Sequence, residues 1–325
     1  MSPGKHKNNR DTSYYGLLTH PNIKQVTFGK YQFNPWYGNA AYFNNQCHTL
    51  LGYQYNNKLQ QDPTLRKTKK LELGDVWLDD IYICEYCFKY TDNQQEITNH
   101  TIVCPYNKPK PTIGKLVYYG TDYIIREVPG FQSRLFCQNL CLFAKLFLVD
   151  KSIYYNIDYF NFYIIYGKDD SNYKPMGVFS KEVLSYDNDN NLACICIFPP
   201  YQRLHLGSLL IEFSYELAKL TPGQLISGPE YPLSPFGKIS YLRYWSKKLA
   251  CLLYNFTEET VTINQLSKLS GFRKEDVLYT LEYMKLLQEE DVVLLSRANL
   301  QVWCKLNNFD PSKELVLLNR DCLTI

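Results

Sequence analysis

The amino-acid sequence predicts an α+β fold, with a mixed core, a small cysteine-containing region before it and a helical region after it. The first observation is that strand-like and helical segments are mixed across residues 113–220. The second is a group of cysteines and a histidine within residues 84–104. The third is that the pattern becomes helical after Pro235. The pattern of the core by itself also allows an α/β arrangement.

The composition narrows the class of protein. The 325 residues can form two domains with a substantial core, and 45% of them are apolar and 21% charged. A formal net charge of +3 is too small for a polycation that bulk electrostatics would hold on nucleic acid. Residues 1–10 lack the apolar segment of a signal peptide, and residues 135–149 are too few and too polar to span a bilayer. Eleven cysteines in such a chain indicate a reduced intracellular compartment, and no membrane association is expected.

The N-terminal third predicts short extended segments between polar stretches. Residues 1–18 are polar and predict a disordered tail. Residues 26–37 are rich in aromatic and β-branched side chains and predict a strand, a turn and extended chain. Residues 56–70 predict a loop, whose basic end is only a weak nuclear import signal. A further strand is expected over residues 81–84.

The central segment supplies the mixed core. The expected strands are residues 113–119, 161–166 and 192–198, and the last of them stops at two prolines. The expected helices, which show apolar residues at helical spacing, are residues 133–147 and 208–220.

The C-terminal region predicts a helix-turn-helix. Thr262 can cap a short helix that runs through Leu269, and residues 270–272 predict a turn. Apolar residues at helical spacing predict a longer helix over residues 274–287. Two helices joined by so short a turn have the geometry of a helix-turn-helix.

This helix-turn-helix is not expected to read DNA. Arg273 and Lys274 begin its longer helix, but three acidic residues follow, namely Glu275, Asp276 and Glu282. A helix that reads a DNA groove carries a clearer basic face. We therefore expect no sequence-specific DNA binding.

Four residues near the N-terminal side of the core have the spacing of a zinc site. Cys84 and Cys87 are separated by two residues, which lets both thiolates bind one ion from a hairpin. His100 and Cys104 are separated by three residues, which places them one helical turn apart. Three thiolates and one imidazole complete a tetrahedron and leave no open position for chemistry, so the predicted zinc is structural. Chance spacing of unrelated cysteines is the alternative.

The zinc finger is interpreted as a scaffold. Between its two ligand pairs lie Lys89, Asp92 and Glu96, which do not form a basic recognition surface. Loss of any one ligand is expected to unfold this region, because metal binding supplies its folding energy.

A turn between a strand and a helix is the candidate anion site. The strand over residues 192–198 stops at two prolines, and the chain then enters a helix whose free N–H groups and dipole favour an anion. Gln202, Arg203 and Gly207 lie in this turn. Neither the P-loop motif nor the dinucleotide fingerprint is present. The turn is interpreted as phosphate-binding, with an ordinary connection as the alternative.

Several motifs, in one order along the chain, resemble those of the MYST family of histone acetyltransferases. The strand, turn and helix of residues 191–217 are similar to the family's acetyl-CoA motif, and the zinc ligands are similar to its finger. The further matching segments are FGKYQFNPWY (28–37), FLVDKSIYYNIDYFNFY (147–163), GVFSKE (177–182), SGPEYPLS (227–234) and KLSGFRKEDV (268–277). The small size and the lack of a reader domain resemble small fungal members of the family.

The resemblance implies a fold and an activity. The implied core is a GNAT-like domain that binds acetyl-CoA, flanked by the zinc-finger subdomain and by a winged-helix-like C-terminal subdomain. The implied divisions are residues 1–18 (tail), 19–115 (N-terminal subdomain), 116–235 (catalytic core) and 236–325 (C-terminal subdomain). The implied activity is transfer of acetyl from acetyl-CoA to a lysine of a nucleosomal histone tail, with histone four expected. The enzyme is expected in the nucleus, with other subunits of an acetyltransferase complex, in silencing or transcription regulation.

The resemblance also assigns catalytic roles. Glu230 matches the family's general base, which a substrate lysine needs because its amine has a pKa near 10.4 and arrives protonated. A partly apolar loop could raise the pKa of such a carboxylate toward working pH. Cys194 matches a cysteine assigned as an acyl-carrying nucleophile, and the alternative, which we favour, is direct attack with Cys194 only lining the site. Lys151 matches a lysine that family members autoacetylate.

The coenzyme is expected to contact the strand and the turn. Ile195 and Ile197 match positions that meet the acetyl and pantetheine arm, and Ser234 matches a further contact. The full set of predicted coenzyme-binding residues is Ile195, Ile197, Gln202, Arg203, Leu204, His205, Leu206, Gly207, Ser208, Leu209 and Ser234.

The chain departs from the family pattern at the coenzyme site. His205 replaces the first glycine of the loop, and its side chain restricts close approach of backbone to a diphosphate. Ser208 stands where a basic residue is usual, and Arg243 where serine is usual. The sequence therefore leaves open a weak enzyme that partner subunits activate and an inactive chromatin scaffold. Retention of Glu230, Cys194 and Lys151 together favours the enzyme.

Overall fold

The computed structural model describes residues 17–18, 20–43, 76–148, 156–169, 172–183, 189–256, 261–288, 294–313 and 315–325. The loop predicted over residues 56–70 and the predicted autoacetylation site Lys151 lie outside these residues. Leu17–Leu18, which fall in the predicted tail, form strand β1, paired with β4 (Gly38–Asn39). Among the described residues, no helix combines the length and the apolar character needed to cross a membrane.

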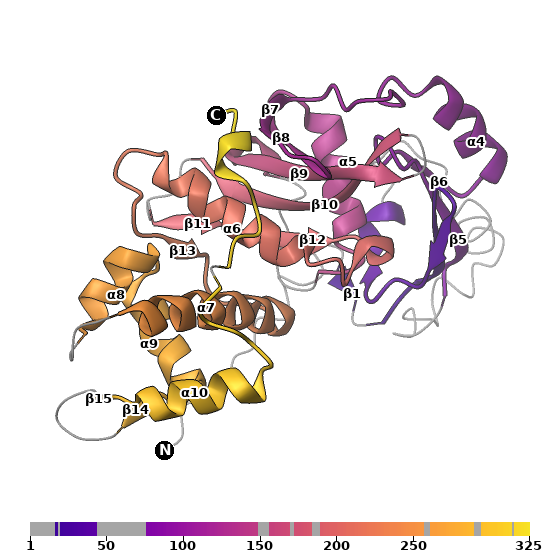
Figure 1. The fold of residues 1–325 in the computed structure, drawn as a ribbon. Helices are drawn as coiled ribbons and strands as arrows, with labels where there is room; N and C mark the ends of the chain where they lie inside the picture. Colours follow the sequence, from indigo (N-terminus) through magenta and orange to yellow (C-terminus); the bar gives the residue numbers. More distant parts are fainter. Residues whose placement is uncertain are drawn as a thin grey trace, which may run out of the picture.

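A five-stranded antiparallel sheet forms the centre of the molecule (Figure 1). Its strands, in spatial order, are β12 (Cys194–Ile197), β10 (Asn172–Glu182), β9 (Phe160–Asp169), β8 (Tyr123–Pro129) and β7 (Lys115–Tyr119). The predicted α+β fold is confirmed. The α/β alternative would have needed parallel strands joined by crossover helices, whereas all four pairings here are antiparallel.

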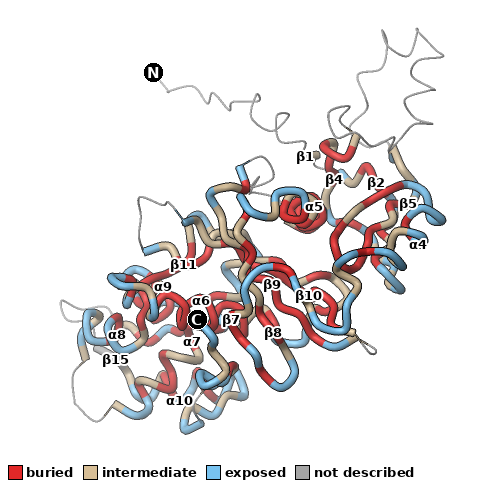
Figure 2. Tube along the Cα trace, turned by 90° about the horizontal axis from the view of Figure 1, so that it is seen from above, coloured by how far each residue is buried: buried red, intermediate tan, exposed pale blue. Residues whose placement is uncertain are grey.

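Two helices cover the two faces of this sheet. Helix α6 (Leu206–Lys219) brings Phe213 against Tyr163 and Phe179, with ring centroids 6.0 and 6.1 Å away. Helix α5 (Arg134–Ala144) lies near Phe162 and Val178, which directly precede Tyr163 and Phe179 on the strands. Residues of α5 line one small cavity together with these two side chains. Neighbouring residues of a strand point to opposite faces, so both faces are covered. Figure 2 shows the buried colour along the middle of β9 and β10.

The prediction of one strand over residues 192–198 is wrong in one respect, because the structure contains two strands in this region. β11 (Asn190–Leu192) leaves the central sheet and pairs in parallel with β13 (Gly228–Pro229), while β12 stays as the edge of the sheet. The break is at Ala193, whose N–H donates to the carbonyl of Ser180 at 2.7 Å. At this bend the loop that contains Glu230 lies next to the sheet edge, since the Glu230 N–H donates to the Leu192 carbonyl at 2.8 Å.

The N-terminal subdomain packs on the central sheet through aromatic rings. Its sheet has the order β3 (Tyr31–Phe33), β2 (Ile23–Phe28), β5 (Leu78–Ile83) and β6 (Tyr90–Thr91), and helix α4 (Gln94–Val103) follows. Phe28 stacks on Phe143 of α5, with ring centroids 4.9 Å apart. Phe88 lies edge-on to Phe198 at 5.6 Å. The two regions therefore share one hydrophobic core.

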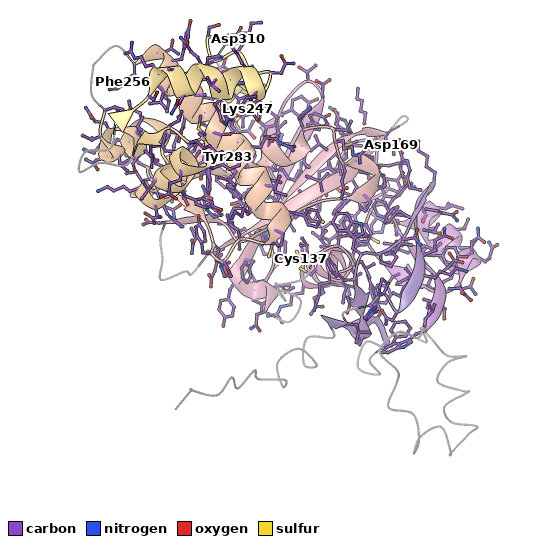
Figure 3. All side chains as sticks on the ribbon, turned by 90° about the horizontal axis from the view of Figure 1, so that it is seen from below. Cys137, Asp169, Lys247, Phe256, Tyr283 and Asp310 are labelled. Atoms are coloured by element: carbon purple, nitrogen blue, oxygen red, sulfur yellow. The ribbon has the colours of Figure 1, made fainter. Side chains whose placement is uncertain are left out.

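Ion pairs, one of them buried, join the same two regions. The Lys174 ammonium lies 2.9 Å from a carboxylate oxygen of Glu85, and the two side chains are 8% and 11% exposed. Asp169, labelled in Figure 3, accepts hydrogen bonds from Lys30 and Tyr201, both at 2.8 Å. Lys30 lies in the turn between β2 and β3, so this network fixes the N-terminal sheet to the end of β9.

The C-terminal region is helical, as predicted. It contains α7 (Pro235–Asn255), α8 (Ile263–Ser270), α9 (Lys274–Tyr283), α10 (Arg297–Leu306) and a hairpin of β14 (Leu287–Gln288) with β15 (Leu294–Leu295). Thr262 caps α8 through a capping box, and Gly271 ends it at φ 78°. The longer helix ends at Tyr283, before the predicted Leu287, because Lys285 is left-handed at φ 56°. The predicted divisions at residues 115–116 and 235–236 stay predictions.

Candidate active site

The four predicted zinc ligands come together in the finger. Cys84 and Cys87 lie in the turn after β5, His100 in the last turn of α4, and Cys104 at its C-cap. Their ligand atoms all lie within 4.8 Å of one another, and His100 Nε2 is 3.1 Å from Cys87 Sγ. Three sulfurs and one imidazole nitrogen at these distances fit a four-coordinate structural zinc site. These residues would hold zinc and leave no position open for a reacting group.

A cavity of about 640 Å³ contains most of the other predicted site residues. Three segments supply most of its lining: the edge strand β12, the turn that enters α6, and the loop that runs from β13 into α7. The predicted residues on its wall are Cys194, Ile195, Ile197, Gln202, Arg203, His205, Leu206, Gly207, Ser208, Glu230 and Ser234. Leu204 and Leu209 do not line it: Leu204 is 51% exposed, and Leu209 packs in the core.

The turn between β12 and α6 presents free backbone N–H groups to this cavity. A 3₁₀ turn over Pro199–Tyr201 is followed by Arg203 and His205, both left-handed at φ 66° and 60°. Helix α6 begins at Leu206, two residues before the predicted start, with His205 as its N-cap. The N–H groups of residues 206–208 therefore have no acceptor within the helix and suit an anion. Gln202 fixes the turn by donating to the Ile197 carbonyl at 3.1 Å.

Two arginines line the same cavity. They are Arg203, in the turn, and Arg243, which lies on α7. Their presence matches the anion preference of the helix N-terminus, because guanidinium groups bind phosphate oxygens through paired hydrogen bonds. The arrangement suits a diphosphate beside this turn.

Glu230 lies immediately after β13. Its side chain is partly buried and lines the cavity together with Cys194 and Ser234. Its backbone is anchored by the hydrogen bond to Leu192, one residue before the strand break at Ala193. The structure thus brings together a carboxylate and a thiol that are far apart in the sequence.

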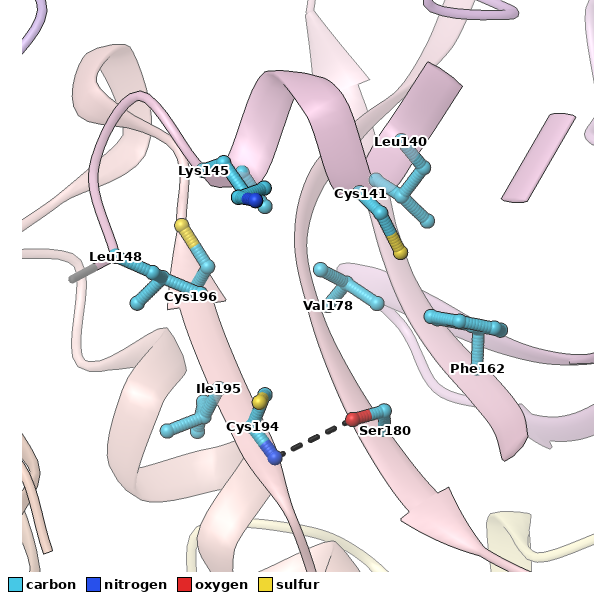
Figure 4. Close-up of a pocket in the computed structure, with 11 residues that line it drawn as sticks. Leu140, Cys141, Lys145, Leu148, Phe162, Val178, Ser180, Cys194, Ile195 and Cys196 are labelled. Atoms are coloured by element: carbon cyan, nitrogen blue, oxygen red, sulfur yellow. Dashed lines mark hydrogen bonds between the residues drawn. The ribbon is translucent and has the colours of Figure 1, made fainter. Parts of the chain in front are cut away.

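Cys194 also faces a second, smaller cavity behind β12. Cys141, Lys145 and Cys196 are among the residues that line it, as Figure 4 shows. Burial raises the pKa of Cys196 to about 12 and lowers the pKa of the Lys145 ammonium. Cys194 is only partly buried, and its N–H donates to the Ser180 hydroxyl at 3.3 Å. Of the two strand cysteines, Cys194 is therefore the more accessible, although both line the larger cavity.

Sequence reasoning missed an aromatic wall of the cavity. Trp36 stands against Phe236 and Phe147, with ring centroids 5.3 and 5.8 Å away, and all three line the cavity. The aromatic run over residues 28–37 was the available signal. It could not be placed at the site because nothing in the pattern sets residue 36 beside residue 236.

Comparison with known proteins gives the family. Residues 111–323 match the MOZ/SAS family. The chain is 43% identical over 307 residues to "Histone acetyltransferase SAS2" of Saccharomyces cerevisiae, which is 93% of this chain and 86% of that protein. It is 38% identical to "Histone acetyltransferase MOF" of Drosophila melanogaster over 72% of this chain and 28% of that protein. It is 37% identical to "Histone acetyltransferase Tip60 homolog" of Caenorhabditis elegans over 70% and 50%.

These matches extend over the central sheet, the cavity and the C-terminal helices. The family match covers the edge strand, the turn into α6 and the loop of Glu230, which are three of the segments that line the cavity. The resemblance to MYST acetyltransferases is thereby confirmed, and the chain belongs to the MOZ/SAS (MYST) family of acetyl-CoA-dependent histone acetyltransferases.

Proposed function

We propose that this chain acetylates a lysine of a histone tail from acetyl-CoA, with Glu230 as general base. The observation that carries the proposal is that Glu230, Cys194 and the turn into α6 line one cavity. An anion site and a carboxylate on the wall of one cavity match what the reaction needs. One group must bind a diphosphate, and another must accept a proton.

The coenzyme site combines the turn with the sheet edge. The N–H groups of residues 206–208, with Arg203 and Arg243, would bind the diphosphate of acetyl-CoA. β12 pairs with β10 on one side only, so its other side can form hydrogen bonds with the amides of a pantetheine arm. In this position the thioester carbonyl would lie beside Cys194 and Ile195.

The chemical step is a direct transfer. The carboxylate of Glu230 removes a proton from the substrate ammonium, and the neutral amine attacks the thioester carbonyl. The amine nitrogen forms a bond to the carbonyl carbon and the carbon–sulfur bond breaks. The leaving coenzyme thiolate takes up the second proton, which the nitrogen loses as it becomes an amide, and departs as the free thiol. In this proposal Cys194 lines the site without carrying the acetyl group.

The biological setting is part of the proposal. By its likeness to proteins named histone acetyltransferases, we propose that the chain acts in the nucleus on nucleosomal histones, with the tail of histone four as substrate. We further propose a role in silencing or transcription regulation, with other subunits of an acetyltransferase complex, and autoacetylation at Lys151.

The direct test is incubation of the purified chain with labelled acetyl-CoA and histone octamers or nucleosomes. We expect label on a histone four tail lysine and on Lys151, located by peptide mass spectrometry. A scaffold without activity is the second candidate, and the left-handed His205 in the place of a glycine is the observation in its favour. Absence of label, also after addition of partner subunits, would establish the scaffold.

The substitution His205→Gly is expected to strengthen coenzyme binding. His205 is left-handed at φ 60°, a conformation that glycine adopts without steric cost, and its ring lines the cavity beside the anion site. We expect the KM for acetyl-CoA to fall roughly threefold to tenfold, which corresponds to about 1 kcal/mol. Steady-state kinetics over a range of acetyl-CoA concentrations gives the value.

The matched control is Leu204→Gly in the same turn. Leu204 is exposed and its backbone lies outside the left-handed region, so glycine brings flexibility there without relief of strain. The KM in this control should stay the same or rise. If the two glycine variants bind acetyl-CoA equally well, the side chain of His205 does not limit the site.

A further inference from the structure

Two side chains of the C-terminal helix-turn-helix contact the loop that carries Glu230. Arg273 is the N-cap of α9, and Asp276 lies in the first turn of that helix. The loop runs through Ser227, β13 and Tyr231, on either side of Glu230. Neither Arg273 nor Asp276 lines the cavity. Any effect of these residues on the reaction must therefore pass through the loop.

The guanidinium of Arg273 binds the backbone immediately before Glu230. It donates to the carbonyl of Pro229 at 3.0 Å and to that of Gly228 at 3.3 Å. It also donates to the carbonyl of Asp189 at 2.7 Å and to the side-chain oxygen of Asn190 at 2.6 Å. One side chain thus joins both strands of the β11–β13 pair. Its planar fork of donors fits this set of acceptors, which a lysine could not span.

Asp276 holds the residue immediately after Glu230. The Tyr231 hydroxyl donates to Asp276 Oδ1 at 2.6 Å, and the Asp276 side chain is completely buried. The second oxygen, Oδ2, has no hydrogen-bond partner among the described residues. A Cβ on Gly228 would come within 2.4 Å of that oxygen, so the carboxylate packs directly on the loop backbone. Burial of a carboxylate with one oxygen lacking a hydrogen bond destabilises a fold. Contacts within α9 do not account for the presence of Asp276 there, whereas its contact with the loop does.

The turn between α8 and α9 adds a backbone contact on the same side. The Ser227 N–H donates to the Gly271 carbonyl at 2.9 Å, and Ser227 forms an isolated parallel bridge with Phe272. The loop is also held by β11 and the residue before it, because the N–H groups of Gly228 and Glu230 donate to the carbonyls of Asp189 and Leu192. The segment around Glu230 is therefore held between a strand of the core and the helix-turn-helix.

We infer that Arg273 and Asp276 are positioning residues for Glu230, so that the helix-turn-helix sets the place of the proton acceptor. The inference rests on the proposed role of Glu230. The loop keeps its bonds to β11 when Arg273 is removed, so it stays attached to the sheet but gains freedom beside Glu230. Because proton transfer requires the carboxylate within hydrogen-bond reach of the amine, the loss appears in turnover rather than in coenzyme binding.

The test compares Arg273→Met with Arg297→Met. Arg297 also stands at the start of a helix and donates to a backbone carbonyl, that of Phe256, but lies outside the cavity and the loop. We expect Arg273→Met to lower kcat roughly tenfold to a hundredfold with the Kd for acetyl-CoA unchanged. Arg297→Met should keep the kcat of the unaltered enzyme. Tyr231→Phe, which removes only the hydroxyl on Asp276, should lower kcat in the same direction by a smaller factor.

A double-mutant cycle separates positioning from loss of folded protein. If Arg273 acts through Glu230, Arg273→Met should cause little further loss in enzyme that already carries Glu230→Gln, whereas a general loss of structure would lower both rates equally. Equal factors in the two backgrounds, or an unchanged kcat in both Arg273→Met and Tyr231→Phe, would overturn the inference. An unchanged kcat in Glu230→Gln alone would instead overturn the proposed function.

Discussion

Replacement of Glu230 by glutamine is expected to lower kcat roughly a hundredfold to ten-thousandfold at neutral pH, the usual contribution of a positioned general base. Glutamine keeps the shape of the side chain but cannot take a proton from the substrate ammonium. Because the proposed diphosphate site is formed by the turn into α6 and the arginines, and not by Glu230, the KM for acetyl-CoA should change by less than about twofold. Initial rates with saturating histone peptide measure both quantities.

The pH dependence of this variant provides a second measurement. A free lysine amine has a pKa near 10.4, so its neutral fraction rises about tenfold for each pH unit below that value. The rate of Glu230→Gln should rise by the same factor between about pH 7 and 9, because solvent then supplies the deprotonation. The unaltered enzyme should show a shallower rise, since Glu230 removes the proton within the complex.

The control for Glu230 is Glu282→Gln on the exposed face of α9. Glu282 is exposed and does not line the cavity, so both the rate and its pH profile should match those of the unaltered enzyme. A Glu230→Gln enzyme with full activity at pH 7 would show that another group accepts the proton.

Removal of zinc is expected to unfold the finger and weaken the core. Structural zinc sites of this kind contribute about 10–16 kcal/mol of apparent binding free energy, while a whole domain is stable by about 5–15 kcal/mol. Phe88 follows Cys87 directly and packs against Phe28, Phe136, Phe143 and Phe198 in the shared core. Loss of the metal therefore releases a buried aromatic ring as well as the finger.

The measurement combines metal content with thermal unfolding. Unaltered chain should contain one zinc ion per molecule, and Cys87→Ser should lack the metal and unfold at a much lower temperature. Cys322→Ser is the matched control, because Cys322 is partly buried near the C-terminal end and is not one of the four ligands. Equal zinc content and equal melting of the two serine variants would show that the four residues do not form a zinc site.

The sequence could predict what local patterns decide. The spacing of the four finger ligands, the capping box at Thr262 and the glycine that ends α8 each depend on residues only a few positions apart. The zinc cluster and the helix-turn-helix were therefore predictable without knowledge of the rest of the chain. The α+β class was also predictable. The α/β alternative was excluded only by the antiparallel directions of the strands in the central sheet.

What the sequence could not predict depends on partners far along the chain. Ala193 interrupts an apolar run that reads as one strand, and the break follows from the pairing of β11 with β13, thirty-six or more residues away. The contact of Trp36 with Phe236 and the hydrogen bond of Arg273 to the Pro229 carbonyl also join residues that are far apart in the sequence. The sequence shows Arg273 only as a basic residue at the start of a helix, where acidic residues offset it. Its four acceptors, two in the loop and two at Asp189 and Asn190, follow only from the three-dimensional structure.

The end of the chain returns to the central sheet (Figure 1). Leu323 bridges Tyr118, and the Thr324 N–H donates to the Val117 carbonyl at 3.1 Å. On the way, the Leu317 N–H donates to Glu212 at 3.2 Å and Arg320 donates to Glu216 at 2.9 Å, both on α6. A hinge rotation of the helical half away from the sheet would have to break these bonds together with the contacts around Glu230. The walls of the cavity are thus preformed. The conformational entropy of the residues that form them is lost once, during folding, and not again each time a histone tail binds.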